Sequence, residues 1–325
     1  MASRSSGSRL RRAAVSAAVV ASVAIPVSGV ARPADVPAPA PAASALLPAV
    51  SARALSERYA ATRADIAAAT ATAAGHGDAR RAAALREMRE PERHILSFDG
   101  RDGGRLVEVF GDLSTADRIA VLVPGAGISV DNYWRLRGAG QSLQRASGRR
   151  TAVVAWLGYR TPTTVSLAAV TPDRAEGAAS ALTSFLTELA ARTPGARTTL
   201  VCHSYGSVVC ARAAAGAKAS AIVLYGSPGT GFGNVTALHT RATVWAGRGA
   251  TDWIADVPHT TVGLGPVSLG FGADPVAPEF GAKVFDAGAA GHSDYLSPGS
   301  RSLRSIATIV AGGTGPEEHH GGPRA

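Results

Sequence analysis

The sequence contains little of the residue that builds metal sites and disulfide frameworks. Cysteine occurs twice in 325 residues, at Cys202 and Cys210, and two residues cannot make a metal site alone. We predict that Cys202 ends a strand and that Cys210 lies about two turns into the following helix, a placement that does not readily give disulfide geometry. We therefore expect two buried thiols, which leave the redox compartment open.

Lysine and aromatic residues are also scarce. Lysine occurs only at Lys218 and Lys283, and aromatic residues make up 5% of the chain. The formal charge of +9 comes mainly from scattered arginines, and it falls to +5 without the four arginines of residues 1–31. Because no basic run is interleaved with aromatic residues, we expect no nucleic-acid partner.

A dinucleotide-binding loop is missing. The sequence Gly125-Ala126-Gly127 begins like a G-x-G-x-x-G pattern, but Val130 stands where the third glycine would be needed. We therefore expect no nicotinamide cofactor, and the sequence implies no metal and no other cofactor.

The composition is that of a folded protein with an export segment. Hydrophobic residues make up 46% and charged residues 18%, so a folded body is expected. Residues 1–31 have a basic start followed by an apolar stretch and small residues at Gly29-Val30-Ala31, the layout of an export signal. An uncleaved membrane anchor is the alternative, because a membrane span needs roughly 20 apolar residues and this stretch is nearly that long.

The rest of the chain divides by composition. Residues 32–50 form a Pro/Ala-rich stretch that predicts an extended linker, and residues 51–93 predict a helical pair in which Asp78 caps the second helix. Residues 94–312 predict the main domain, and residues 313–325 a disordered tail. We expect an exported protein, secreted or associated with the membrane or cell wall through its N-terminal segment.

Buried strands alternate with helices in the main domain. This order predicts an α/β fold with a doubly wound, mostly parallel sheet and an N-terminal helical appendage. The expected strands are 95–98, 106–110, 119–123, 152–156, 199–202, 221–225, 243–246 and 284–285, and the expected helices are 173–191, 208–215 and 302–310.

The stretch from Thr199 to Ser207 predicts a nucleophile elbow. An apolar strand ends at Cys202-His203-Ser204-Tyr205-Gly206, and a small-residue helix follows. This strand–turn–helix context projects a serine above the sheet edge in the G-x-S-x-G motif. Ser204 is therefore the candidate nucleophile, although Cys202 stands where the first glycine is usual.

An acid and a base are expected on later loops, in that order along the chain. Asp252 follows the strand 243–246 and is the candidate acid, with Asp256 and Asp274 as alternatives. His292 follows the strand at Val284 and is the candidate base. Among the other histidines, His203 is expected to pack away from Ser204, and His239 and His259 lie on loops that fit the order less well.

Two backbone amides are candidates for an oxyanion hole. The amide of Tyr205 follows the nucleophile, and the second donor is expected from the loop after the strand 119–123. We choose Ala126 there, with Gly127 as the neighbouring alternative.

These residues resemble the α/β-hydrolase superfamily and, more narrowly, an actinobacterial family known as domain of unknown function 1023. The resemblance implies that Ser204, Asp252 and His292 act as nucleophile, acid and base. It departs from the pattern at Cys202 and at Phe271, where relatives are expected to carry a glycine and a histidine. The similar stretches are 58–66, 107–113, 121–125, 203–207, 252–254, 272–275, 280–282 and 291–296.

The sequence therefore predicts an exported serine hydrolase that acts on a small-molecule or lipid-like ester. The alternative is a hydrolase-fold protein of the cell envelope that binds a ligand without turnover. The presence of Cys202 at the elbow, where glycine is usual, favours this alternative. Residues 226–240 are too few for a large lid domain. An apolar wall for an acyl chain is expected within residues 253–281, from Ile254, Val257, Leu264, Leu269 and Phe271.

Overall fold

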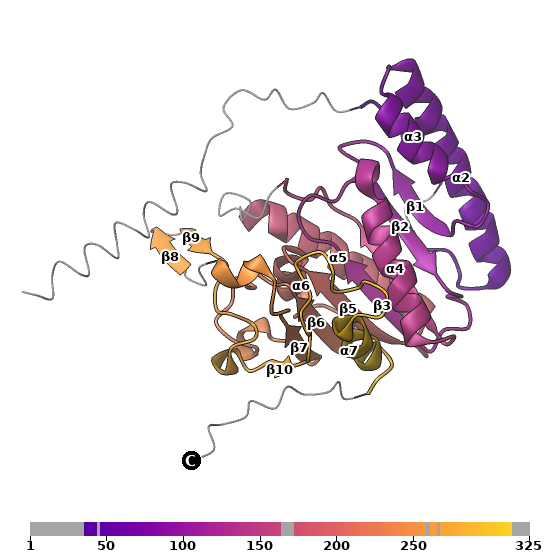
Figure 1. Ribbon diagram of the computed structural model, residues 1–325. Coiled ribbons are helices and arrows are strands. Elements are labelled where there is room, and N and C mark those ends of the chain that lie inside the picture. The colour runs from indigo at the N-terminus through magenta and orange to yellow at the C-terminus, as the bar shows by residue number, and fades with distance from the viewer. Residues whose placement is uncertain (1–35, 44–45, 164–171, 258–260, 265–266, 314–325) are drawn as a thin grey trace, which may run out of the picture. The chain divides into compact units, whose positions relative to one another are not determined.

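The computed structural model describes residues 36–43, 46–163, 172–257, 261–264 and 267–313, with the side chains of 172–174 and 261–270 excepted (Figure 1). The predicted export signal lies outside these residues, as does the predicted tail of residues 313–325 apart from Gly313. No helix within the described ranges is long and apolar enough to cross a membrane.

An eight-stranded sheet forms the centre of the described chain, in the order β1-β2-β4-β3-β5-β6-β7-β10. The pairs β1/β2 and β2/β4 are antiparallel, and all the others are parallel. The predicted mostly parallel sheet is thus confirmed. The strands are β1 (Ile95–Asp99), β2 (Arg105–Phe110), β3 (Arg118–Val123), β4 (Thr151–Leu157), β5 (Arg197–His203), β6 (Ala221–Tyr225), β7 (Thr243–Gly247) and β10 (Lys283–Val284).

The register brings the carboxyl ends of the parallel strands to one edge. Val123 of β3 lies opposite Cys202 of β5, and His203 of β5 lies opposite Tyr225 of β6. Tyr225 in turn lies opposite Gly247 of β7. The loops that follow β3, β5, β6 and β7 therefore leave the sheet side by side, which is where ligand sites of open α/β sheets form.

Helices cover both faces of this sheet (Figure 1). Helices α5 (Pro172–Arg192) and α6 (Gly206–Ala213) pack together over one core cluster, and α4 (Trp134–Ser147) and α7 (Arg301–Val310) pack over the other. Successive strand residues alternate between the two clusters, as in Val121 and Leu122 of β3. Short 3-10 helices lie in the loops: η1 (Val130–Asn132), η3 (Thr236–Leu238), η4 (Trp253–Asp256) and η5 (Pro278–Phe280).

The N-terminal appendage is a pair of helices, α2 (Ala52–Gly75) and α3 (Ala79–Glu87), and α2 packs against β1. Ser51 caps α2 by accepting a hydrogen bond from the Ala54 amide, and Asp78 caps α3 as predicted. Ile66 and Leu85 are buried in the core cluster that the appendage shares with one face of the sheet. The apolar face of the pair is therefore core.

The chain before α2 is held against the body. Val36 and Ala38 pack on the core cluster that includes Ile66 and Leu85 of the appendage, and the carboxylate of Asp65 accepts hydrogen bonds from the amides of Ala42 and Ala43 at 2.9 and 3.0 Å. Leu47 is buried, and its amide donates to Glu188 of α5 at 2.7 Å. Much of the stretch predicted as a linker therefore packs on the folded body.

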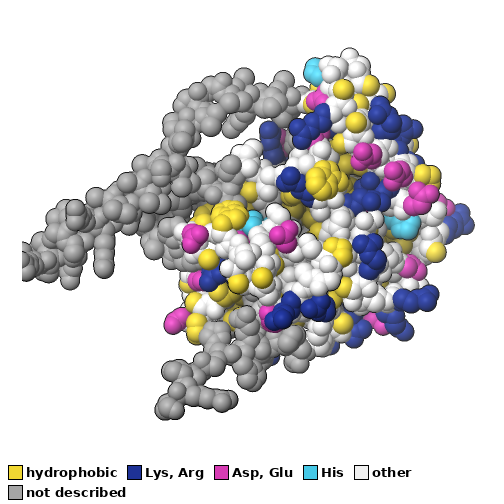
Figure 2. Space-filling view, in the orientation of Figure 1, with side chains coloured by type: hydrophobic (Ala, Val, Ile, Leu, Met, Phe, Trp, Pro, Cys, Tyr) yellow, Lys and Arg dark blue, Asp and Glu magenta, His cyan; other side chains and the backbone are white. Residues whose placement is uncertain are grey.

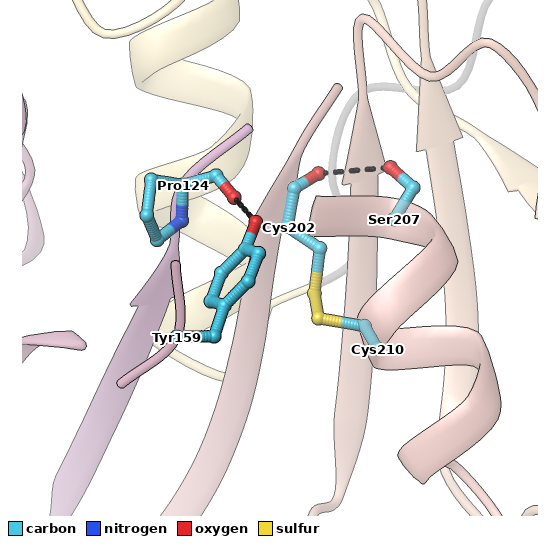
Figure 3. The surroundings of a disulfide bond; sticks show 5 residues. All are labelled: Pro124, Tyr159, Cys202, Ser207 and Cys210. Carbon is cyan, nitrogen blue, oxygen red and sulfur yellow. Dashed lines mark hydrogen bonds between the residues drawn. A yellow bond between two sulfur atoms is a disulfide. The ribbon is translucent and has the colours of Figure 1, made fainter. Parts of the chain in front are cut away.

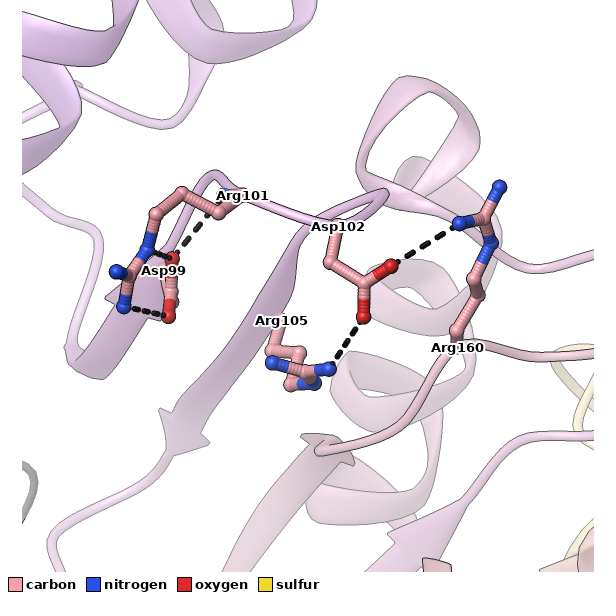
Figure 4. A network of polar contacts seen from close by, with 5 residues as sticks. All are labelled: Asp99, Arg101, Asp102, Arg105 and Arg160. Atoms are coloured by element: carbon pink, nitrogen blue, oxygen red, sulfur yellow. Dashed lines mark hydrogen bonds and ion pairs between the residues drawn. The ribbon is translucent and has the colours of Figure 1, made fainter. Parts of the chain in front are cut away.

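Ion pairs fasten the loop of the β1–β2 hairpin (Figure 4). Asp99 binds the Arg101 guanidinium, and Asp102 binds both Arg105 and Arg160, so that the hairpin loop is joined to the segment after β4. All five side chains are partly exposed, and such pairs each contribute little to stability. On the face shown in Figure 2, Lys and Arg side chains are interspersed with acidic ones.

Candidate active site

Ser204 lies in the turn between β5 and α6, and its backbone has φ of +51°. This left-handed conformation is strained for a residue with a side chain. The Ser204 amide donates to the Tyr225 carbonyl at 3.0 Å, which fastens the turn to the end of β6. The elbow geometry thus occurs where the sequence predicts it.

Two glycines allow the elbow to fit against the loop after β3. A Cβ atom on Gly206 would lie 2.6 Å from the Val123 carbonyl oxygen and 2.7 Å from that of Pro124. A Cβ atom on Gly125 would lie 2.7 Å from the Cβ of Ser204. All three distances are shorter than a real Cβ atom tolerates, so these positions require glycine.

The two cysteines form a disulfide, which corrects the prediction of two buried thiols. The Cα atoms of Cys202 and Cys210 are 6.5 Å apart, within the range that a disulfide spans. The prediction failed because the turn at Ser204 reverses the chain, so that α6 runs back along β5. Residues eight apart in the sequence are therefore neighbours across the strand and the helix.

His292 joins Ser204 to Asp252 in a chain of hydrogen bonds. Its Nε2 lies 3.0 Å from the Ser204 hydroxyl, and its Nδ1 lies 2.9 Å from Oδ1 of Asp252. These partners assign the tautomer in which Nδ1–H donates to the carboxylate and Nε2 accepts from the serine. The structure therefore brings together the three side chains that the sequence selects from loops after β5, β7 and β10.

Asp252 is buried and receives further hydrogen bonds. The Ile254 amide donates to its Oδ1 at 2.9 Å, and the Tyr295 hydroxyl donates to its Oδ2 at 2.6 Å. Burial raises the pKa of Asp252, but the hydrogen bonds from His292, Tyr295 and the Ile254 amide outweigh it and lower that pKa below its ordinary value of 3.8. The carboxylate is therefore ionised at neutral pH.

Neither of the two alternative acids forms the hydrogen bond to His292 Nδ1, which is made by Asp252. Asp256 is exposed at the end of η4, and Asp274 pairs with Arg248 at 2.6 Å. Of the alternative bases, His239 follows η3 and His259 lies outside the described residues. Asp252 is the carboxylate that contacts His292.

Tyr295 and His203 contribute hydrogen bonds to the site that the sequence does not predict. The buried Tyr295 hydroxyl accepts from the Gly249 amide at 2.9 Å while it donates to Asp252, so it joins two loops. His203 Nε2 lies 2.7 Å from the His292 carbonyl oxygen, which makes that nitrogen the donor. His203 therefore has more than the packing role expected of it.

The histidine next to the nucleophile is neutral. Burial, together with repulsion from His292, lowers the pKa of His203 from 6.5 to about 4. Its ring stacks on Tyr225 with the centroids 4.9 Å apart. The half-exposed Trp253 ring also lies near His292, with its centroid 4.5 Å from the imidazole.

The second oxyanion donor is predicted to come from the loop after β3. Gly125 lies directly against Ser204, and Ala126 follows it. The Gly127 amide donates to the Pro162 carbonyl at 2.7 Å, so it is engaged elsewhere. Of the two alternatives, Ala126 is therefore the better candidate, together with Tyr205 at the N-terminus of α6.

The predicted apolar wall is wrong in part. Ile254 and Phe271 are 0% and 1% exposed, so they belong to the core and cannot line a substrate surface. Val257 is partly buried. Leu264 and Leu269 lie in the antiparallel pair of β8 (Thr261–Leu264) and β9 (Val267–Gly270). The side chains of these two leucines are outside those described. No group of three or more metal-ligating side chains occurs in the part of the chain that the structure describes.

A family profile described as alpha/beta hydrolase matches residues 99–262, about half of the chain. The chain belongs to this alpha/beta hydrolase family. The match includes the elbow and Asp252, whereas His292 lies beyond its end.

Two curated relatives are uncharacterized proteins from two strains of Mycobacterium tuberculosis, each 31% identical over 254 residues. The alignment covers 67% of this chain but 38% of each relative, so the chain spans well under half of their length.

Solved structures of hydrolases align with the chain. Esterase PE8 aligns over 62% of this chain and 95% of its own, with 18% identity and a TM-score of 0.44. XC6422 from Xanthomonas campestris, described as an a/b serine hydrolase without lid, aligns over 67% of this chain and 92% of its own, with 16% identity and a TM-score of 0.45.

Proposed function

We propose that this alpha/beta hydrolase is an exported serine hydrolase that cleaves an ester or related acyl bond through a covalent acyl-enzyme. The observation that carries the proposal is the hydrogen-bond chain from Ser204 through His292 to the buried Asp252, at 3.0 and 2.9 Å. On the motifs described above, we also propose membership of the family known as domain of unknown function 1023.

The first half-reaction acylates the serine. Ser204 Oγ bonds to the carbonyl carbon of the ester while its proton passes to Nε2 of His292. Ionised Asp252 stabilises the imidazolium through Nδ1–H, and the amides of Tyr205 and Ala126 face the oxyanion. When the tetrahedral intermediate collapses, the bond to the alkoxy oxygen breaks, and His292 donates its proton to the departing alcohol.

The second half-reaction releases the acid. Water attacks the carbonyl carbon of the acyl-enzyme and gives a proton to His292 Nε2. The bond between that carbon and Ser204 Oγ then breaks, and the same proton returns to Oγ. The products are one alcohol and one carboxylic acid, and the enzyme regains its starting state.

Export is supported by two independent features. Residues 1–31 have the layout of an export signal, and the disulfide between Cys202 and Cys210 belongs to the chemistry of oxidising compartments. For the substrate we propose a small or lipid-like ester, with the exposed Trp253 ring beside His292 as the apolar contact.

The alternative of a binding protein without turnover has lost its main support. That alternative depended on Cys202 distorting the elbow, but Cys202 is linked to α6 and Ser204 lies within hydrogen-bond distance of His292. No second function is therefore proposed.

A fluorophosphonate probe tests the proposal, because it labels only an activated serine. We expect the purified protein to be labelled, and labelling to be lost in Ser204→Ala and His292→Ala, with both variants folded by circular dichroism. A folded wild-type protein that stays unlabelled would overturn the catalytic assignment. A chain-length series of p-nitrophenyl esters then identifies the preferred acyl group.

A further inference from the structure

The conformation of Ser204 needs support from its surroundings. A residue with a side chain persists at a φ of +51° only where neighbouring contacts over-determine it. In the proposed function, this conformation is what holds the hydroxyl 3.0 Å from His292 Nε2. The groups that fix the turn therefore decide how well the nucleophile is aligned.

Hydrogen bonds hold the turn along its backbone. The Ser207 amide donates to the Ser204 carbonyl at 2.9 Å, and the Ser207 hydroxyl donates to the Cys202 carbonyl at 3.2 Å. On the side of β3, the Tyr159 hydroxyl donates to the Pro124 carbonyl at 2.6 Å (Figure 3). That carbonyl lies against Gly206.

The disulfide closes the turn covalently. Figure 3 shows the side chains of Cys202 and Cys210 joined between the end of β5 and α6. Cys202 stands two residues before the nucleophile, and both cysteines are fully buried. The strand that enters the elbow and the helix that leaves it are thus fixed to each other, with Ser204 inside the closed loop.

We propose that the Cys202–Cys210 disulfide is a positioning element of the catalytic elbow. The sulfur link takes the place of the close glycine contact that usual elbows have between strand and helix. When the link is absent, the strand end and α6 separate slightly, and Ser204 loses its alignment with His292 while the fold persists. The expected loss of labelling rests on the proposed function. The expected separation of the strand end from α6 does not.

The double variant Cys202→Ser/Cys210→Ser removes the link with little change in side-chain volume. We expect the rate constant of fluorophosphonate labelling to fall by about 10- to 100-fold, because misplacement of a reacting group by about 1 Å costs up to this much. We also expect faster hydrogen–deuterium exchange at the amides of residues 205–209, measured on the full chain by mass spectrometry. Alkylation of the denatured, unreduced protein should find no free thiol in the wild type.

Leu85→Ala is a matched control for lost stability. Leu85 is buried in α3, in the appendage and away from the elbow, so this variant weakens the fold without contact with Ser204. It should keep the labelling rate and the exchange at 205–209 of the wild type.

Three outcomes would overturn the proposal: two free thiols in the wild type, unchanged exchange at 205–209 in the serine double variant, or labelling within about twofold of the wild type in that variant. If the wild type itself is never labelled, the proposed function fails, and exchange alone decides whether the disulfide holds the elbow.

Discussion

At the scale of single residues, the site depends on side chains that do not themselves react. Tyr295 donates to the carboxylate oxygen of Asp252 that His292 does not use, and His203 donates to the carbonyl of His292. Each of them forms a hydrogen bond to a member of the Ser204–His292–Asp252 chain without taking part in the proposed proton transfer. Their removal should therefore change alignment and titration rather than abolish the chemistry.

Tyr295→Phe removes one hydrogen bond to Asp252 and the acceptor of the Gly249 amide. We expect kcat/KM toward an ester to fall by about 10- to 100-fold, since a hydrogen bond to a charged group is worth roughly 1.5–3 kcal/mol. The Tyr295 hydrogen bond lowers the pKa of Asp252, so its loss raises that pKa. The stability that ionised Asp252 contributes is lost as pH falls through its folded pKa, so acid unfolding should begin at a higher pH than in the wild type. Identical kcat/KM and acid-unfolding curves would contradict this role.

His203→Gln keeps an N–H donor but removes a titrating group. Because the folded pKa of about 4 lies below the ordinary 6.5, the unfolded chain binds more protons between these values. The free energy of unfolding should therefore rise with pH across this window, by on the order of 3 kcal/mol for this group. Urea unfolding at pH 4.5 and pH 7 measures the difference, which should be clearly smaller in the variant. A variant with the same pH dependence as the wild type would show that His203 is not the group responsible.

At the scale of elements, the close packing of α6 against β3 can be tested with two helical glycines. In Gly206→Ala the new methyl group meets the Val123 and Pro124 carbonyls, so α6 must shift; we expect fluorophosphonate labelling to fall by about 100-fold. Gly138→Ala in α4 is the control, because nothing lies within 4 Å of its new Cβ. It should stabilise the protein by about 0.5–1 kcal/mol and leave labelling unchanged. Equal labelling in both variants would contradict the packing argument.

Most elements follow from the sequence because apolar runs and helix caps are local signals. The strands from β3 to β7 are continuous apolar runs, and Ser51 and Asp78 mark helix starts. Helix α4 was not predicted, because Gly138 and Gly140 within it lower helix propensity. The reason for Gly140 is tertiary: a Cβ there would lie 2.4 Å from the Phe110 ring of β2.

The residues of the candidate site also divide into those that local sequence signals predict and those that depend on tertiary contacts. Ser204, Asp252 and His292 can be selected because each follows a recognisable strand. Tyr295 and His203 could not be, since their contacts depend on how separate loops meet; His203 and His292 are 89 residues apart. The disulfide was missed for a related reason, because the reversal of the chain at the elbow is not contained in the spacing of the two cysteines.

At the scale of the whole molecule, a buried ion pair joins the segment after the appendage to the sheet. Arg93 and Glu108 of β2 have side chains 5% and 1% exposed, and Arg93 Nη2 donates to Glu108 Oε2 at 2.8 Å. Arg93 also donates to the Glu87 carbonyl at the end of α3. The pair therefore links the end of α3 to the interior of the sheet.

Glu108→Ala should strongly destabilise the protein, because it leaves the Arg93 guanidinium buried without its partner. We expect a loss of about 3–5 kcal/mol in the free energy of unfolding, measured in guanidinium chloride. Asp117→Ala, which breaks the exposed pair with Arg150, is the control and should change little. Similar midpoints for the two variants would show that the buried pair is not a principal link.

Contacts made by Val36, Ala38, Ala42, Ala43 and Leu47 leave less of the predicted linker free to extend. A free stretch of residues 32–50 in extended form would reach about 60 Å at 3.1 Å per residue. With Val36 already packed on the body, four residues separate it from the predicted leader, and four residues span at most about 14 Å. If the leader stays in a membrane, the body is therefore confined to the immediate vicinity of the lipid surface, and esters within that layer are the ones it can reach.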